Sequence, residues 1–276
     1  MKGSAPAARL EGLRNEAGKW VVRETRDREV ILSILNQDRV FAAYALGDLD
    51  PSLFEQCRWI VAEHMDGSSA LALLFKGLEP DTLLLYGEPR GHAVILATAM
   101  RPASVYAIFT EAQKPALEAH YALAEVRSML RMAWDNAVRI PPASPFVFRL
   151  SGARLAELQS LYRLYAESYF SPYQLMQGIF YGVERDGRLV SVAGTHLISR
   201  AYGVAALGNV FTHPDYRGWG YAQACTAEVL RELRGQAKTV VLNVGAENLA
   251  AQQVYKKLGF SPYCEFFEAM AYRNKA

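Results

Sequence analysis

A glycine-rich turn in the second half of the chain has the composition of an anion-binding loop. It reads Arg-Gly-Trp-Gly-Tyr-Ala over residues 217–222 and follows a short apolar stretch. Gly218 and Gly220 carry no Cβ, so the backbone can bend sharply there and approach a ligand closely. If a helix begins at this turn, its first N–H groups are unpaired and its dipole favours negative charge. Arg217 adds a full positive charge, and the sequence therefore predicts a diphosphate site here.

Two better-known phosphate loops do not match this turn. The nucleoside-triphosphate loop ends in Gly-Lys-Ser/Thr, whereas this turn has Gly-Trp-Gly-Tyr. The dinucleotide fingerprint requires Gly or Ala at the position of Gln223, and an acidic residue about twenty positions later. Neither requirement is met, so the turn is neither of these two phosphate-binding loops.

A third pattern fits at every position. Arg-x-x-Gly-x-Ala, preceded by the apolar stretch 210–212 and a proline, resembles the coenzyme A loop of the GNAT acyltransferase superfamily. Farther on, the stretch from Asn248 through Tyr255 to Gly259-Phe260 resembles that family's next motif, and a helix and a strand separate the two. The resemblance implies that coenzyme A or acetyl-CoA is held by Val210, Phe211, Thr212, Arg217, Gly218, Trp219, Gly220, Tyr221, Ala222, Asn248 and Tyr255.

The reaction that the resemblance implies is direct attack of an amine on the acyl carbon, which needs one proton removed and one returned to the leaving thiolate. Tyr255 matches the family tyrosine that serves the thiolate, although an aromatic residue on an amphipathic helix is ordinarily a core residue. Asn248 has an alternative role as a helix N-cap. Both roles of Asn248 are compatible.

The general base is less clear. Many relatives have a glutamate on the strand before the loop, but residues 205–212 contain no carboxylate. Asn209 can orient a water, and His196 on the preceding predicted strand has a suitable intrinsic pKa. A satisfied buried histidine is the alternative for His196, and Glu265 and Glu268 are further candidates. Tyr169, Phe170 and Tyr173 fall where this fold overhangs the acceptor groove, so we expect them at the substrate site unless they form an aromatic plug between helices.

The spacing of apolar residues predicts an α/β protein with a mixed sheet. Helices are predicted over 30–35, 41–46, 93–100, 117–134, 154–166, 221–234 and 247–258. Strands are predicted over 58–62, 70–76, 82–86, 104–109, 179–184, 188–199, 205–212, 239–244 and 263–272, with an Asp-Gly hairpin turn at 186–187. Ser171 and Pro172 are expected to keep the aromatic stretch 169–173 irregular.

A chain of 276 residues exceeds the usual size of one domain. We expect a mobile tail over 1–19, a degenerate GNAT-like domain over 20–140 and a GNAT acyltransferase domain over 146–276. Pro141, Pro142 and Pro145 form the predicted connector. The whole chain resembles tandem GNAT proteins of the glycine N-acyltransferase-like type. For the first half, this resemblance rests on the order of the predicted elements alone.

The composition of the chain limits the classes of partner that we expect. The net charge of +2 lacks the basic surplus of a nucleic-acid-binding protein, and no signal peptide or membrane-spanning run is present. Three well-separated cysteines show no metal-ligand spacing and favour a reducing, cytoplasmic setting. We therefore expect an N-acyltransferase that uses acetyl-CoA and a small-molecule or amino-acid-like amine, with no metal, nucleic acid or membrane. The alternative is a CoA-binding regulatory module without turnover, and the oligomeric state is left open.

Overall fold

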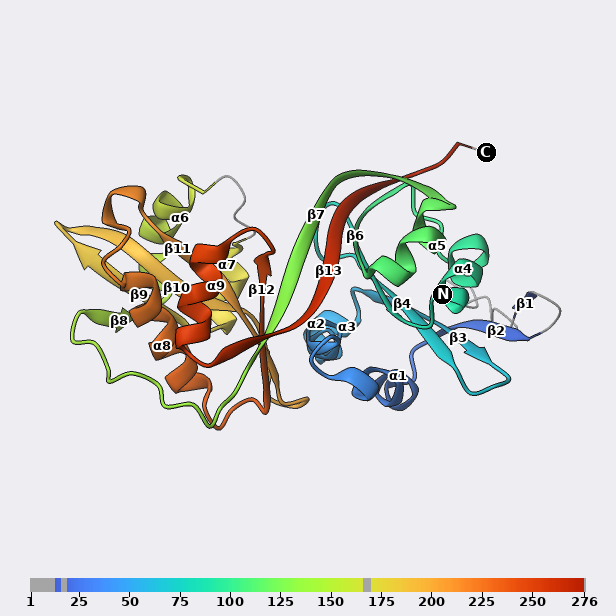
Figure 1. Ribbon diagram of the computed structural model, residues 1–276, viewed down its shortest axis with the longest axis horizontal. Coiled ribbons are helices and arrows are strands. Elements are labelled where there is room, and N and C mark those ends of the chain that lie inside the picture. The colour runs from blue at the N-terminus through green and yellow to red at the C-terminus, as the bar shows by residue number, and fades with distance from the viewer. Residues whose placement is uncertain (1–12, 16–18, 166–169, 276) are drawn as a thin grey trace, which may run out of the picture. The chain divides into compact units, whose positions relative to one another are not determined.

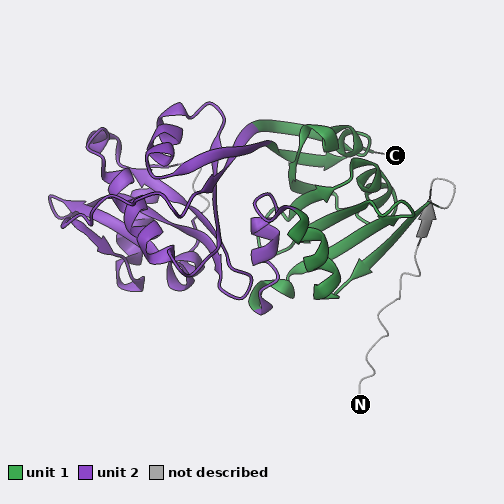
Figure 2. Ribbon diagram, turned by 60° about the horizontal axis from the view of Figure 1, so that its bottom comes forward, with its two compact units in different colours: residues 1–37, 52–127, 266–276 green, residues 38–51, 128–265 purple. Residues whose placement is uncertain are grey.

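The computed structural model describes residues 13–15, 19–165 and 170–275, and it divides the chain at places other than the predicted connector. Unit 1 comprises residues 1–37, 52–127 and 266–276, and unit 2 comprises 38–51 and 128–265 (Figure 2). The three connector prolines lie inside unit 2. Each unit therefore takes residues from both halves of the chain. Residues 1–12 and 16–18 of the predicted tail lie outside the described residues.

Unit 1 is a mixed sheet with helices (Figure 1). Its strands follow the order β1-β2-β3-β4-β5-β6-β13, in which only β5 and β6 pair in parallel. Its elements are β1 (Leu13–Asn15), β2 (Trp20–Thr25), α1 (Arg28–Leu35), β3 (Cys57–His64), β4 (Ser69–Phe75), β5 (Thr82–Gly87), α4 (Pro89–Thr98), β6 (Ser104–Phe109), η2 (Glu111–Gln113) and α5 (Lys114–Glu118).

The strands of unit 2 follow the order β7-β12-β11-β10-β9-β8, in which only β11 and β12 pair in parallel. Its elements are α2 (Ala43–Gly47), β8 (Val147–Arg149), η3 (Gly152–Arg154), α6 (Leu155–Tyr162), α7 (Pro172–Gln177), β9 (Phe180–Arg185), β10 (Arg188–Ser199), β11 (Val204–Thr212), η4 (Pro214–Tyr216), α8 (Tyr221–Leu233), β12 (Thr239–Gly245) and α9 (Leu249–Lys257). Elements with residues in both units are η1 (Asn36–Asp38), α3 (Pro51–Phe54), β7 (Tyr121–Trp134) and β13 (Phe260–Arg273).

The last strand of each half is exchanged. β7 comes from the first half of the sequence, yet its residues 129–133 pair with β12 in unit 2. β13 ends the second half, yet its residues 267–272 pair with β6 in unit 1. The mixed α/β class predicted from the sequence is confirmed, whereas the split into 20–140 and 146–276 differs from these units because the closing strands cross over.

The prediction of a helix over 117–134 is wrong. Leu123, Val126, Leu130 and Trp134 have helical spacing, but the segment is the strand β7 after the short α5. Met132 and Trp134 are buried at a spacing of two, as pairing with β12 requires. Tertiary pairing overrode a local periodicity, which is common for apolar segments.

The prediction that the stretch 169–173 is irregular is wrong at Pro172 and Tyr173, which begin α7, whereas Phe170 and Ser171 precede the helix and Tyr169 lies outside the described residues. Pro172 occupies the first turn of α7, where its missing N–H costs nothing. Ser171 and Gln174 form a capping box, because the Gln174 side chain accepts from the Ser171 N–H at 3.0 Å. The predicted Asp-Gly hairpin turn is present, with positive φ at Asp186 (52°) and Gly187 (70°).

Helices cover both faces of the unit 2 sheet. Ala205 and Leu207 of β11 pack in the same cluster as α8 and α9, whereas Ala206 between them packs with α2. Residues of α6 and α7 pack with Phe211 and Val192, in a cluster of their own that contains no residue of α8 or α9. No described helix has both the length and the apolar character needed to cross a bilayer.

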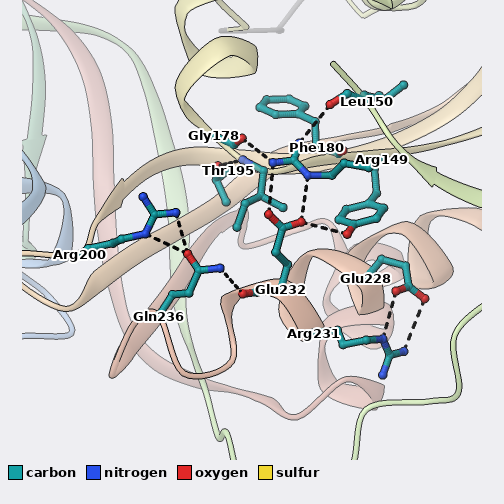
Figure 3. Close-up of polar contacts among 12 residues, drawn as sticks. Arg149, Leu150, Gly178, Phe180, Thr195, Arg200, Glu228, Arg231, Glu232 and Gln236 are labelled. Carbon is teal, nitrogen blue, oxygen red and sulfur yellow. Dashed lines mark hydrogen bonds and ion pairs between the residues drawn. The ribbon is translucent and has the colours of Figure 1, made fainter. Parts of the chain in front are cut away.

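A polar network holds α8 against the neighbouring strands (Figure 3). Arg149 of β8 donates to Glu232 of α8 at 2.9 Å and to the Gly178 carbonyl at 3.0 Å. The Tyr181 hydroxyl also donates to Glu232, and burial together with that carboxylate raises the pKa of Tyr181 to about 12. On the next turn, Glu228 pairs with Arg231. The contacts of Glu232 therefore tie α8 to β8 and β9, whereas the Glu228–Arg231 pair lies within the helix.

Candidate active site

The loop before α8 is an open cradle. Gly218 and Gly220 have φ of +83° and +77°, and a Cβ built at either would meet nothing within 4 Å. Gly220 is the residue before the first turn of α8, so the unpaired N–H groups of a thirteen-residue helix begin here. The Arg217 Nε donates to the Thr212 carbonyl at 3.3 Å, which ties the loop back to β11. The predicted helix start and strand are confirmed, and the loop has the geometry that an anion site needs.

The aromatic residues of this loop have two different environments. Trp219 is 72% exposed and stacks beside Tyr221. Tyr221 is buried, and its hydroxyl accepts from Arg185 at 3.0 Å. Tyr221 therefore anchors the helix, while Trp219 offers a free aromatic face. A hollow of about 180 Å³ adjoins the loop and is lined by Pro141, Pro142, Gly220, Gln223, Ala224 and Ala227.

β11 and β12 separate just before the loop. They pair only from Val204–Thr239 to Leu207–Leu242, while β12 continues its pairing with β7 as far as Gly245. Residues 209–212 therefore leave β12, and no ladder partner faces them on that side among the described residues. Phe211 is buried, and the Thr212 hydroxyl contacts Ser191 at 2.8 Å. The free edge at Val210–Thr212 matches the expectation drawn from the family resemblance.

Two β-bulges flank the separation, and each carries a residue singled out from the sequence. Asn209 has φ of +53° and lies in the register shift of β11 opposite β10. His196 is the extra residue between the pairs Thr195–Leu207 and Leu197–Ala206. Bulges re-aim side chains and are frequent beside active sites.

His196 lies against the backbone of β11 at the separation. A Cβ at Gly208 would lie 2.0 Å from its Cδ2 and 2.1 Å from its Nε2, so only glycine leaves room for the ring. Its Nδ1 is 3.3 Å from the Gln174 amide nitrogen, and the Asn209 amide donates to Gln174 at 3.2 Å. The Tyr44 ring is 6.4 Å away. Burial lowers the pKa of His196 to about 4, so the imidazole is neutral at neutral pH.

Tyr255 lies on the α9 side of the sheet and is buried. Burial first, and then the neighbouring Tyr165 hydroxyl, raise its pKa, so the phenol stays protonated. Tyr165 stacks on Phe211 of β11, with ring centroids 5.2 Å apart. We did not single out Tyr165 from the sequence, where it was one apolar residue of a helix. Its link to Tyr255 is visible only in three dimensions.

The remaining candidates divide into core, cap and surface residues. The Asn248 side chain accepts from the Ala251 N–H at 3.1 Å, as an N-cap does. Phe170 stacks on Tyr162 at 4.9 Å and contacts Phe180 edge-on, which matches the aromatic plug. Tyr173 is 51% exposed. Tyr169 lies outside the described residues.

The two further base candidates both lie on β13. Glu265 is an exposed residue of unit 2. Glu268 belongs to unit 1, where it accepts from the Tyr106 hydroxyl at 2.7 Å. Among the described residues, no group of three or more His, Cys, Asp or Glu side chains is arranged to hold a metal ion.

A segment from the first half of the sequence completes this side of unit 2. Arg131 of β7 is 1% exposed, donates to the Asn243 side chain at 3.0 Å and to the Phe41 carbonyl, and lies over the Tyr44 ring at 5.0 Å. These contacts hold residues 38–51 on β11 and β12, and bring Tyr44 to His196. Sequence reasoning missed this arrangement because it depends on contacts about ninety residues apart.

The residues present fit a coenzyme A thioester. An open, positively polarised loop suits a diphosphate, and a free strand edge suits amide groups of an extended arm. Buried Tyr255 belongs to the hydrophobic cluster against which Val210 of that edge packs. The opposite face, with His196 and Tyr44, remains for a second reactant.

Comparison with known proteins agrees with this geometry. The profile of the acetyltransferase (GNAT) family matches residues 151–260. A mycothiol acetyltransferase of Streptomyces coelicolor is 37% identical over 99 residues, which cover 34% of this chain and 29% of that protein. One of Streptomyces avermitilis is 33% identical over 102 residues, or 36% of this chain and 30% of that protein. The chain thus spans under a third of the length of these relatives.

Solved structures share the fold over more of the chain. A Drosophila melanogaster protein has a TM-score of 0.63 at 16% identity, covering 91% of this chain and 98% of its own. A GNAT-family protein of Novosphingobium aromaticivorans has a TM-score of 0.54 at 22% identity, covering 70% and 84%. A tandem GNAT protein from the clavulanic acid biosynthesis pathway has a TM-score of 0.53 at 13% identity, covering 94% and 100%. The acetyltransferase (GNAT) family profile thus matches residues 151–260, where the glycine cradle and the separated strands lie, and the solved structures share the fold over most of the chain.

Proposed function

We propose that unit 2 binds acetyl-CoA and transfers its acetyl group to the amine of a small molecule. The observation that carries this proposal is the open cradle at Gly218 and Gly220, placed directly after the residues of β11 that leave β12. The two together provide a diphosphate site joined to a strand edge. The partial match to mycothiol acetyltransferases supports an acetyl donor and a small acceptor.

Each residue then has a defined task. The N–H groups of 218–222 and the Arg217 guanidinium would hold the diphosphate, and the edge of Val210–Thr212 would bind the amides of the pantetheine arm. Trp219 and the hollow beside Gly220 border the loop on the nucleotide side. Bound there, acetyl-CoA supplies a thioester carbonyl as the electrophile.

The proton transfers fall to the residues around the strand separation. The backbone N–H near Val210 would donate to the thioester oxygen, as the resemblance implies. Tyr255 would give its proton to the departing sulfur, and its raised pKa keeps that proton in place beforehand. Asn209 would orient the water that takes the proton of the attacking amine.

The test is release of free thiol from acetyl-CoA by the full chain in the presence of a panel of small amines, with the product mass measured. An acetylated amine and amine-dependent thiol release are expected. Thermal stabilisation by coenzyme A without thiol release from any amine would favour the alternative, a CoA-binding regulatory module. No stabilisation by coenzyme A would refute both, because a ligand at 100 times its Kd should add about 2.7 kcal/mol.

A further inference from the structure

The capping box of α7 fixes the orientation of the Gln174 amide. A backbone N–H can only donate, and that of Ser171 points at Gln174 Oε1 from 3.0 Å. The Asn209 Nδ2 points at the same oxygen from 3.2 Å. The atom facing these two donors must therefore be the amide oxygen. The NH₂ group of Gln174 is thereby turned toward His196, 3.3 Å from its Nδ1.

The tautomer of His196 follows from this contact. An amide NH₂ group has no lone pair to offer, so His196 Nδ1 accepts and carries no proton. In a neutral imidazole the proton then resides on Nε2. The low pKa of His196 keeps the ring in this neutral form at neutral pH.

The Nε2 edge of His196 lies at the strand separation. The ring packs on Gly208, which directly follows Leu207, the last residue of β11 paired with β12. Residues two positions apart on a strand face the same side of the sheet, so Gly208 shares a face with Ala206. Ala206 packs with α2, on the face opposite α8. Among the described residues, the His196 ring makes its hydrogen bond through Nδ1, to Gln174, and none through Nε2. An N–H donor therefore stands beside the opening, on the face away from the diphosphate loop.

We infer that His196 is a fixed hydrogen-bond donor to an oxygen of the acceptor, and that Gln174 is the positioning residue that sets its tautomer. This inference rests on the proposed function for the identity of the bound molecule. It makes small amines that also carry a hydroxyl, carbonyl or carboxylate oxygen the preferred acceptor class. It also replaces the role of general base expected for His196 from the sequence, since Nε2 holds a proton instead of a lone pair.

The tautomer is tested without turnover. In the full chain labelled with ¹⁵N-histidine, two-bond ¹H–¹⁵N correlations report which ring nitrogen is protonated, and the His196→Gln spectrum identifies the signals of His196. We expect a protonated Nε2 and a bare Nδ1. Gln174→Glu keeps an oxygen for the Ser171 N–H but replaces the NH₂ by an acceptor, so a proton should appear on Nδ1. A wild-type ring protonated on Nδ1, or no change in Gln174→Glu, would overturn the assignment.

The ligand class is tested by the ratio of kcat/KM for ethanolamine to that for propylamine, two amines of nearly equal size. Loss of one neutral hydrogen bond in His196→Ala should lower this ratio about 2- to 13-fold, and His196→Gln should restore most of it. An equal loss of about 10²- to 10⁴-fold for both amines in both variants would instead identify His196 as the base. An unchanged ratio in His196→Ala would also refute the donor role. If neither amine nor any of the panel is acetylated, the proposed function fails while the tautomer result stands.

Discussion

Replacing Gly220 by alanine separates the stability of the loop from its binding role. At φ of +77° an L-residue is strained, and the cost is about 1–2 kcal/mol. A methyl group there would meet no protein atom within 4 Å, so no steric term adds to this cost. The variant should therefore fold, with a Tm lower by about 2–8 °C if each kcal/mol shifts it by about 2–4 °C.

The same methyl group would stand in the open space that a bound phosphate needs. Losing one hydrogen bond between a loop N–H and a charged phosphate is worth about 1.5–3 kcal/mol, or about 10- to 150-fold in the Kd for coenzyme A. Gly220→Asp should abolish binding, because it adds a negative charge to the same obstruction. Isothermal titration calorimetry with coenzyme A measures the Kd, and thermal unfolding without ligand measures the stability.

Gly235 provides a matched control. It follows α8 with φ of +85°, and a Cβ there also meets nothing within 4 Å. Gly235→Ala should therefore lose the same stability as Gly220→Ala and keep the wild-type Kd. If the two variants bind coenzyme A equally well, the cradle before α8 is not the diphosphate site and the reasoning fails.

Three other outcomes test the assignments. Tyr255→Phe should lower kcat by about 10²- to 10⁴-fold and leave coenzyme A binding unchanged. The control Tyr216→Phe loses an exposed hydroxyl that is bonded to Asp186, and it should keep the full rate. A full rate in Tyr255→Phe would show that Tyr255 is not the acid. His92 is fully buried and its pKa is lowered to about 4, so between pH 6.5 and 4 its ring binds fewer protons in the folded state than in the unfolded state. This histidine alone should cost about 2 kcal/mol of stability on going from pH 7 to pH 5, so the loss measured by urea unfolding between these two pH values should be about 2 kcal/mol smaller in His92→Gln than in the wild type. Burial and Asp50 raise the pKa of Asp48 to about 7, so ionisation of Asp48 lowers the free energy of unfolding as pH rises, opposite to the effect of His92. Asp48→Asn should therefore gain stability relative to the wild type as pH rises from about 4 to 7. Parallel plots of unfolding free energy against pH for the two proteins would contradict this.

The glycine-rich turn before α8 could be predicted from the sequence because its requirements are local. Two glycines must adopt positive φ, a helix must begin at once, and an apolar strand must precede it. Each of these is written within about twenty consecutive residues. The hairpin turn at Asp186-Gly187 and the strands β9, β10 and β12 were predictable for the same reason.

The exchanged strands could not be predicted because their partners are distant in sequence. Residues 117–134 offered helical spacing, and nothing nearby indicated that Ala133 pairs with Val241. The domains were predicted as consecutive segments because Pro141, Pro142 and Pro145 form a stiff connector between the two halves. The compact units differ from that division because β7 of the first half pairs with β12, and β13 of the second half pairs with β6.

The acceptor side of the site shows where sequence reasoning ends. A single register shift turns His196 toward Gly208, and residue type alone gives no sign of that shift. The tautomer of His196 depends on Ser171, which we took from the sequence as a breaker of regular structure and which is instead the N-cap that orients Gln174. A histidine with an ordinary intrinsic pKa was thus the natural candidate for a base, whereas its hydrogen bonds make it a donor. The chemistry of a titratable residue is set by the partners of both of its nitrogens, and those partners lie on other elements of the fold.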